Sequence, residues 1–142
     1  IPVVRSDRGG EITFHGPGQL VVYFMINLKR RGWGPKRLVQ ELEELIINLL
    51  KLYAIEAERK TGFPGIYVEE KKIASIGLKI NRGYSYHGIS LNVDMDMSPF
   101  KQINPCGISS LQLIQMKDLT DVSMEDVRNN FAEAIEDHFD SI

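Results

Sequence analysis

Cys106 is the only cysteine in the sequence, and it stands between Pro105 and Gly107. Proline restricts the backbone on one side and glycine leaves it open on the other, which is a suitable setting for a reactive thiol. A cysteine thiolate is a strong nucleophile. A lone cysteine is, however, most often a small buried apolar side chain. The local sequence alone leaves both interpretations open.

A second candidate is a pair of lysines, Lys71 and Lys72, at the start of an alternating segment, KIASIGLKI. Side chains alternate across a strand. We therefore expect Lys72 on the face of Ala74, Ile76, Leu78 and Ile80, and Lys71 on the face of Ile73, Ser75, Gly77 and Lys79. Burying a lysine among apolar side chains costs free energy unless the lysine is paired or its pKa falls. A lowered pKa would suit a catalytic base. The alternative is that Lys72 reaches solvent from the strand end.

The third candidate is the segment RGGEITFHGPGQ, residues 8–19, which has four glycines and one proline. Glycine allows a backbone to approach a ligand closely and to present its N–H groups. A pair of turns around a short strand explains the composition equally well. The segment is neither a Walker phosphate loop nor a dinucleotide fingerprint, because the spacing of neither motif is present.

Other site chemistries find little support. His15, His87 and His138 are scattered and no cysteine pair exists, so no zinc site is predicted. Asp94 and Asp96 lack a third ligand at a suitable spacing. No G-x-S-x-G elbow of a serine hydrolase occurs. His87 is expected on an apolar strand face, where it is typically a hydrogen-bonded core histidine.

The elements that must position these residues follow from periodicity. Strands are predicted at 20–28, 65–68, 72–80 and 84–93, with the nearly continuous apolar run 20–28 as a central buried strand. Residues 81–83 predict a hairpin turn. One helix begins near Pro35, with an apolar stripe at Leu38, Leu42, Leu45, Leu49 and Tyr53; another begins near Ser123. We expect an α/β fold with a mixed, largely antiparallel sheet and helices packed on it.

The overall composition indicates a single ordinary domain over residues 1–142. The chain is 43% hydrophobic and 25% charged, and its net charge of −2 argues against nucleic-acid binding. No apolar run is long enough for a membrane span. One cysteine forms no intrachain disulfide, so a reducing, cytoplasmic location is expected.

Four segments together resemble one family. RGGEITFHGPGQLVVYF, KKIASIG, HGISLNV and INPCGI occur here in the order and at the separations of the lipoyl(octanoyl) transferases. The resemblance runs from about Val3 to about Ile108. It implies the fold of the biotin and lipoyl protein ligase catalytic domains. It also implies that the chain lacks the N-terminal portion that this family has upstream of the residues matching Ile1.

The resemblance assigns roles to individual residues. Cys106 matches the nucleophile and Lys72 the lysine that activates it. Three segments match those that bind the acyl substrate: Arg8, Gly9, Gly10, Glu11, Ile12, Thr13, Phe14 and His15; Ser75, Ile76 and Gly77; and Gly88, Ile89 and Ser90.

The implied activity is transfer of an octanoyl group from octanoyl-acyl carrier protein to a lysine of a lipoyl domain, through an acyl-cysteine. The implied partners are that carrier and the lipoyl domains of 2-oxoacid dehydrogenase complexes. Neither ATP, a metal nor another cofactor is implied.

Two other functions compete with this one. An ATP-dependent lipoate or biotin ligase of the same fold would need no cysteine. A non-catalytic module would only hold carrier or lipoyl domains; the basic stretch KRRGWGPKR (29–37) could dock an acidic carrier, or it is a solvated basic loop.

Overall fold

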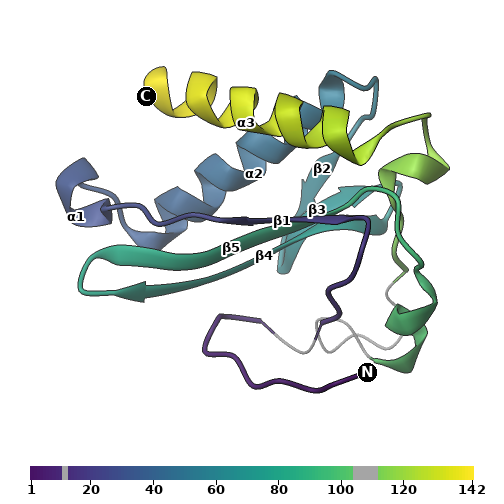
Figure 1. Cartoon of the computed structure of the whole chain (residues 1–142). Coiled ribbons are helices and arrows are strands. Elements are labelled where there is room, and N and C mark those ends of the chain that lie inside the picture. The colour runs from purple at the N-terminus through teal and green to yellow at the C-terminus, as the bar shows by residue number, and fades with distance from the viewer. Residues whose placement is uncertain (11–12, 104–111) are drawn as a thin grey trace.

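The computed structural model describes residues 1–10, 13–103 and 112–142. A five-stranded sheet forms its centre, in the order β1 (Gln19–Tyr23), β5 (Tyr84–Asn92), β4 (Lys71–Asn81), β3 (Phe63–Val68) and β2 (Glu58–Lys60). All neighbouring strands pair antiparallel. The helices α2 (Pro35–Lys51) and α3 (Met124–Asp140) cover one face of this sheet (Figure 1). This arrangement confirms the predicted α/β fold.

The other face of the sheet is covered by the N-terminal segment and by the 3-10 helix η1 (Ser98–Gln102) (Figure 1). The short helix α1 (Leu28–Arg31) follows β1, and a second 3-10 helix, η3 (Met116–Asp118), precedes α3. The sequence patterns did not predict α1, β2 or the 3-10 helices. Neither of the long helices, nor any other helix in the described ranges, has the length and apolar content of a membrane span.

The helix predictions hold, because capping and periodicity agree in both segments. Pro35 is the first residue of α2, where its missing N–H costs nothing. The Ser123 side chain accepts a hydrogen bond from the Asp126 N–H at 3.1 Å and caps α3. The helix α2 ends at Lys51, so Tyr53 lies beyond it.

The core lies between the sheet and the two long helices. Ala74 on β4 pairs with Leu91 on β5, and both are buried with side chains of α2 and α3 such as Leu42 and Phe131. The predicted hairpin turn joins these strands: Arg82 has φ +53° and Gly83 has φ +84°, as a tight two-residue turn requires.

The prediction of a central buried strand over 20–28 is wrong. The strand β1 ends at Tyr23 and is an edge of the described sheet, with the side chains of Val21 and Tyr23 exposed by 37% and 68%. Residues 20–24 are all apolar because Leu20 and Phe24 enter the core, whereas Val21 and Tyr23 line a cavity on the other face.

Candidate active site

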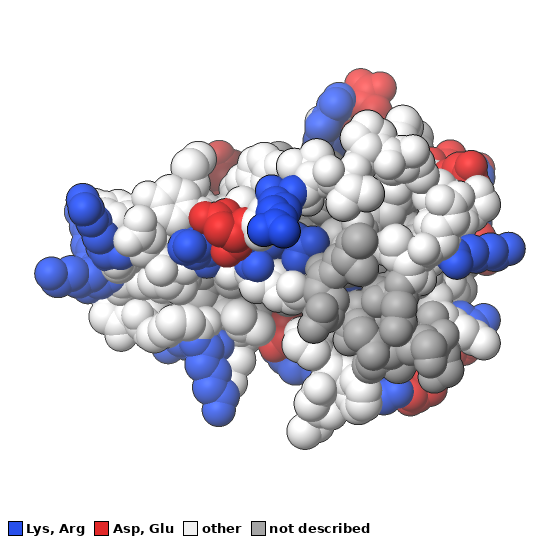
Figure 2. Space-filling model, turned by 90° about the horizontal axis from the view of Figure 1, so that it is seen from below, with Lys and Arg blue, Asp and Glu red and all other residues white. Residues whose placement is uncertain are grey.

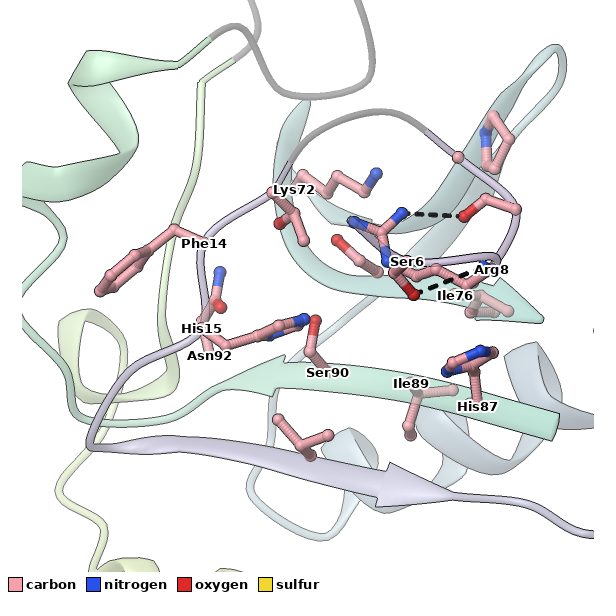
Figure 3. A pocket seen from close by; sticks show the side chains of 18 of the residues that line it. Ser6, Arg8, Phe14, His15, Lys72, Ile76, His87, Ile89, Ser90 and Asn92 are labelled. Atoms are coloured by element: carbon pink, nitrogen blue, oxygen red, sulfur yellow. Dashed lines mark hydrogen bonds between the residues drawn. The ribbon is translucent and has the colours of Figure 1, made fainter. Parts of the chain in front are cut away.

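A cavity of about 660 Å³ lies on the face of the sheet that α2 and α3 leave open (Figure 3). Its floor is formed by β4 and β5, and its walls by the N-terminal segment, the loop before β1, Phe100 and Leu113. This volume lies within the range of about 300–1,000 Å³ that is usual for small-molecule sites. Seen from this side of the molecule, most of the surface of the described residues is uncharged (Figure 2).

The cavity brings together the described residues that the sequence assigned to substrate binding. Its lining includes Arg8, Gly9, Gly10, Thr13, Phe14, His15, Ser75, Ile76, Gly77, Gly88, Ile89 and Ser90, together with Lys72. Glu11, Ile12 and Cys106 lie outside the described residues.

Lys72 is buried, with 2% of its surface exposed, and it faces the cavity (Figure 3). The alternative that its side chain reaches solvent is therefore wrong. Gly65 on β3 makes room for it. A Cβ atom at Gly65 would lie 2.4 Å from Lys72 Cε and 2.7 Å from the Ala74 carbonyl oxygen. Gly65 also has φ +118°, a conformation that favours glycine.

The predicted alternation along β4 fails at Lys72. Ile66 pairs with Ala74, but the next residue, Tyr67, pairs with Lys72, so Ile73 is an extra residue on β4. Such a bulge interrupts the alternation of side chains. Lys72 therefore lines the cavity with Ser75 and Gly77, and the prediction that it shares a face with core residue Ala74 is wrong.

The chain returns to Lys72 just after the segment that holds Cys106. The Lys72 N–H donates to the Gln112 carbonyl at 2.9 Å, and the Ile114 N–H donates to the Lys72 carbonyl at 3.0 Å. Leu113, between them, lines the cavity. Cys106 precedes Gln112 by six residues.

The glycines of the N-terminal segment allow it to pack directly on β4. The Gly9 N–H donates to the Leu78 carbonyl at 2.9 Å. A Cβ atom at Gly77 would lie 3.0 Å from both Arg8 Cδ and the Gly9 carbonyl oxygen. The close approach of these two backbones explains why glycine is present on both sides of the contact.

His87 is not a core histidine, so that prediction is also wrong. Its φ of +63° departs from strand geometry and its ring lines the cavity. His87 Nε2 lies 2.7 Å from Asp7 Oδ1, and Lys79 Nζ lies 3.4 Å from Asp7 Oδ2. The hydrogen bond from His87 is the main reason that the pKa of Asp7 lies below its usual value. These contacts fasten the N-terminal segment to β4 and β5.

Several residues of the cavity were missed by the sequence patterns. Phe100 packs edge-on against Phe14, with ring centroids 5.6 Å apart. Asn92 joins Gln19 and Ile114 in a buried set of hydrogen bonds. The available signal for this wall was two polar residues, Ser90 and Asn92, that alternate with apolar residues at the end of β5.

No metal site was found in the described ranges, which contain no cluster of three or more His, Cys, Asp or Glu side chains in ligating positions. Asp96 Oδ1 accepts a hydrogen bond from the Ser98 N–H at 3.0 Å, which lowers the pKa of its carboxyl group.

The fold is that of lipoate and biotin protein ligases of known structure. The chain is similar in structure to a lipoate-protein ligase A bound with ATP, with a TM-score of 0.74 over 94% of this chain and 57% of that chain, at 18% sequence identity. At this level of identity the likeness establishes the fold.

The family follows from the sequence comparisons. A family model described as the lipoyl protein ligase A/B catalytic domain matches residues 1–136, and the chain belongs to this family. It is 58% identical over 119 residues to an octanoyltransferase of Shewanella pealeana, covering 84% of this chain and 54% of that protein. It is 53% identical over 127 residues to an octanoyltransferase of Vibrio cholerae, covering 89% and 59%. The chain thus spans about half the length of the curated relatives it matches.

Proposed function

We propose that the protein transfers an octanoyl group from octanoyl-acyl carrier protein to a lysine of a lipoyl domain, through a thioester on Cys106. The observation that supports this most is the buried Lys72 in an open cavity, hydrogen-bonded through its backbone to the chain that follows Cys106. Six residues span at most about 20 Å when extended, so Cys106 is within reach of the cavity.

The chemistry requires two acyl transfers. Lys72 accepts the proton of the Cys106 thiol, and the thiolate attacks the carbonyl carbon of the donor thioester. The bond to the carrier's sulfur breaks, and that sulfur takes the proton. The amine of the lipoyl-domain lysine then attacks the acyl-cysteine, a C–N bond forms and the C–S bond breaks, and Lys72 passes a proton of the amine to the departing sulfur of Cys106. A lysine beside a cysteine favours the thiolate, the reactive form.

An ATP-dependent ligase is the weaker candidate. The relatives that share more than half of their aligned residues with this chain are named octanoyltransferases, whereas the ligase structure that shares its fold is 18% identical. A ligase also gives no role to Cys106.

The test is a pair of arginine substitutions on neighbouring residues. Lys72→Arg keeps the positive charge but removes the base, and we expect the transfer rate to fall by about 10²–10⁴-fold. Lys71→Arg, one residue earlier on β4, is the matched control and should keep the wild-type rate. Equal rates for the two variants would contradict the assignment of Lys72.

A further inference from the structure

A chain of hydrogen bonds runs from the cavity wall to the backbone of Lys72. His15 Nδ1 lies 2.8 Å from Gln19 Oε1, Gln19 Nε2 donates to Asn92 Oδ1 at 3.0 Å, and Asn92 Nδ2 donates to the Ile114 carbonyl at 3.2 Å. The Ile114 N–H in turn donates to the Lys72 carbonyl at 3.0 Å.

This chain determines the tautomer of His15. The Ile114 carbonyl can only accept, so Asn92 must present its NH₂ group there and its oxygen to Gln19. Gln19 then donates to that oxygen and turns its own oxygen toward His15. A neutral His15 must therefore carry its proton on Nδ1 and present Nε2 as an acceptor. Gln19 and Asn92 are both buried, which keeps this orientation fixed.

The ring of His15 is placed to act on a molecule in the cavity. It lines the cavity and is exposed, and Nε2 has no hydrogen-bond partner among the residues that the structure describes. The other histidine of the cavity differs, because His87 Nε2 is held by Asp7. In Figure 3, His15 and Asn92 lie together at one end of the cavity and His87 lies at the other.

The second half of the proposed reaction can use such an acceptor. A lysine amine arrives as an ammonium with three N–H protons, and the amide product keeps one. Two protons must therefore leave the nitrogen. Lys72 can pass one of them to the departing sulfur of Cys106. A second base that is open to solvent takes the other proton without a second transfer through Lys72.

We propose that His15 Nε2 accepts this second proton from the amine of the acceptor lysine, with Gln19 and Asn92 as positioning residues. This proposal rests on the proposed function. The step balances: acyl-Cys106, a lysine ammonium and neutral His15 give an amide, the Cys106 thiol and an imidazolium, which releases its proton to solvent.

The test separates the two half-reactions in the intact protein. The acyl-protein is formed with octanoyl-acyl carrier protein, isolated, and then mixed with a lipoyl domain, and both rates are followed by intact-mass spectrometry. In His15→Asn the amide nitrogen can replace Nδ1 and keep the bond to Gln19, while Nε2 is lost. We expect the ratio of the second rate to the first to fall by about 100-fold.

Two further variants distinguish proton acceptance from positioning. His15→Gln places an amide near the position of Nε2, which can form a hydrogen bond but cannot take a proton, so it should be as slow as His15→Asn. His138→Asn is the control and should keep both rates. His138 lies on α3 and is hydrogen-bonded to Glu41 on α2, on the side of the sheet away from the cavity.

The outcomes separate this proposal from the function on which it rests. A wild-type protein that forms no acyl-cysteine would overturn both. If acylation and transfer proceed but the variants slow the two steps equally, or if His15→Gln keeps the wild-type ratio, only the role of His15 is overturned. Nitrogen NMR of the neutral imidazole should show a protonated Nδ1 and an unprotonated Nε2, and the opposite tautomer would also overturn it.

Discussion

Replacing Gly65 with alanine tests whether the position of Lys72 controls the reaction. The new methyl group would lie 2.4 Å from Lys72 Cε, 3.3 Å from Lys72 Nζ and 2.7 Å from the Ala74 carbonyl oxygen. The first and third distances are well inside van der Waals contact. The carbonyl belongs to the sheet backbone and moves little, so the lysine side chain must leave its place in the cavity.

Two effects should follow from Gly65→Ala. The free energy of unfolding should fall by about 2–4 kcal/mol, because the methyl group overlaps its neighbours and the φ of +118° is strained for alanine. The transfer rate should fall by about 10²-fold or more, because the side chain that we propose as the base is displaced from its place in the cavity. Urea denaturation gives the first quantity and the single-turnover transfer rate of the folded protein gives the second.

Gly62 provides the matched control. It also has a positive φ, +81°, but among the described residues, its two chain neighbours aside, no atom lies within 4 Å of the position that a Cβ would take. Gly62→Ala should therefore cost about 1–2 kcal/mol of backbone strain and leave the transfer rate unchanged. If Gly65→Ala folds and transfers octanoyl groups as fast as Gly62→Ala, the position of Lys72 in this structure does not control the chemistry.

Three other predictions concern the framework around the site. Glu69 and Glu70 form the β3–β4 turn with φ of +49° and +70°, so Glu69→Asn with Glu70→Gly should raise the free energy of unfolding by about 1 kcal/mol in urea. Ser123→Ala removes the cap of α3 and should lower it by about 1 kcal/mol in the same assay. Because the hydrogen bond from His87 lowers the pKa of Asp7, the ionised carboxylate stabilises the fold above the unfolded-state pKa of about 3.9, and this stabilisation is lost as the pH falls through the lower folded-state pKa. Asp7→Asn should therefore reduce stability at pH 6 but not at pH 2, and a difference that persists in acid would contradict the argument.

The sequence predicted the elements whose signals are local. The helices α2 and α3 carry both an apolar stripe and a terminal signal, Pro35 and Ser123, and the hairpin turn carries Gly83. Because these signals lie within a few residues of the structure they specify, periodicity was sufficient to find them.

The errors arose where distant segments decide the geometry. The bulge that turns Lys72 into the cavity depends on the pairing of β4 with β3 and on the space beside Gly65. The left-handed conformation of His87 has no marker in its own sequence. Gln19 and Asn92 are 73 residues apart, so their hydrogen bond could not be predicted from spacing.

The role of β1 shows why hydrophobicity alone is ambiguous. An apolar run can be buried on both faces of a sheet, or it can cover the core on one face and line a ligand cavity on the other. Val21 and Tyr23 follow the second arrangement, which places β1 at an edge of the described sheet beside the cavity.

The most direct test of the account is whether octanoyl-acyl carrier protein, without ATP, leaves an octanoyl group on Cys106. We expect intact-mass and peptide-mapping measurements to find one octanoyl group per protein, attached to Cys106 and removed by hydroxylamine as a thioester is. The adduct should be absent from Cys106→Ser and should form about 10²–10⁴-fold more slowly in Lys72→Arg. An adduct that forms equally well in Cys106→Ser, or transfer to a lipoyl domain that requires ATP and proceeds without Cys106, would contradict the proposed mechanism.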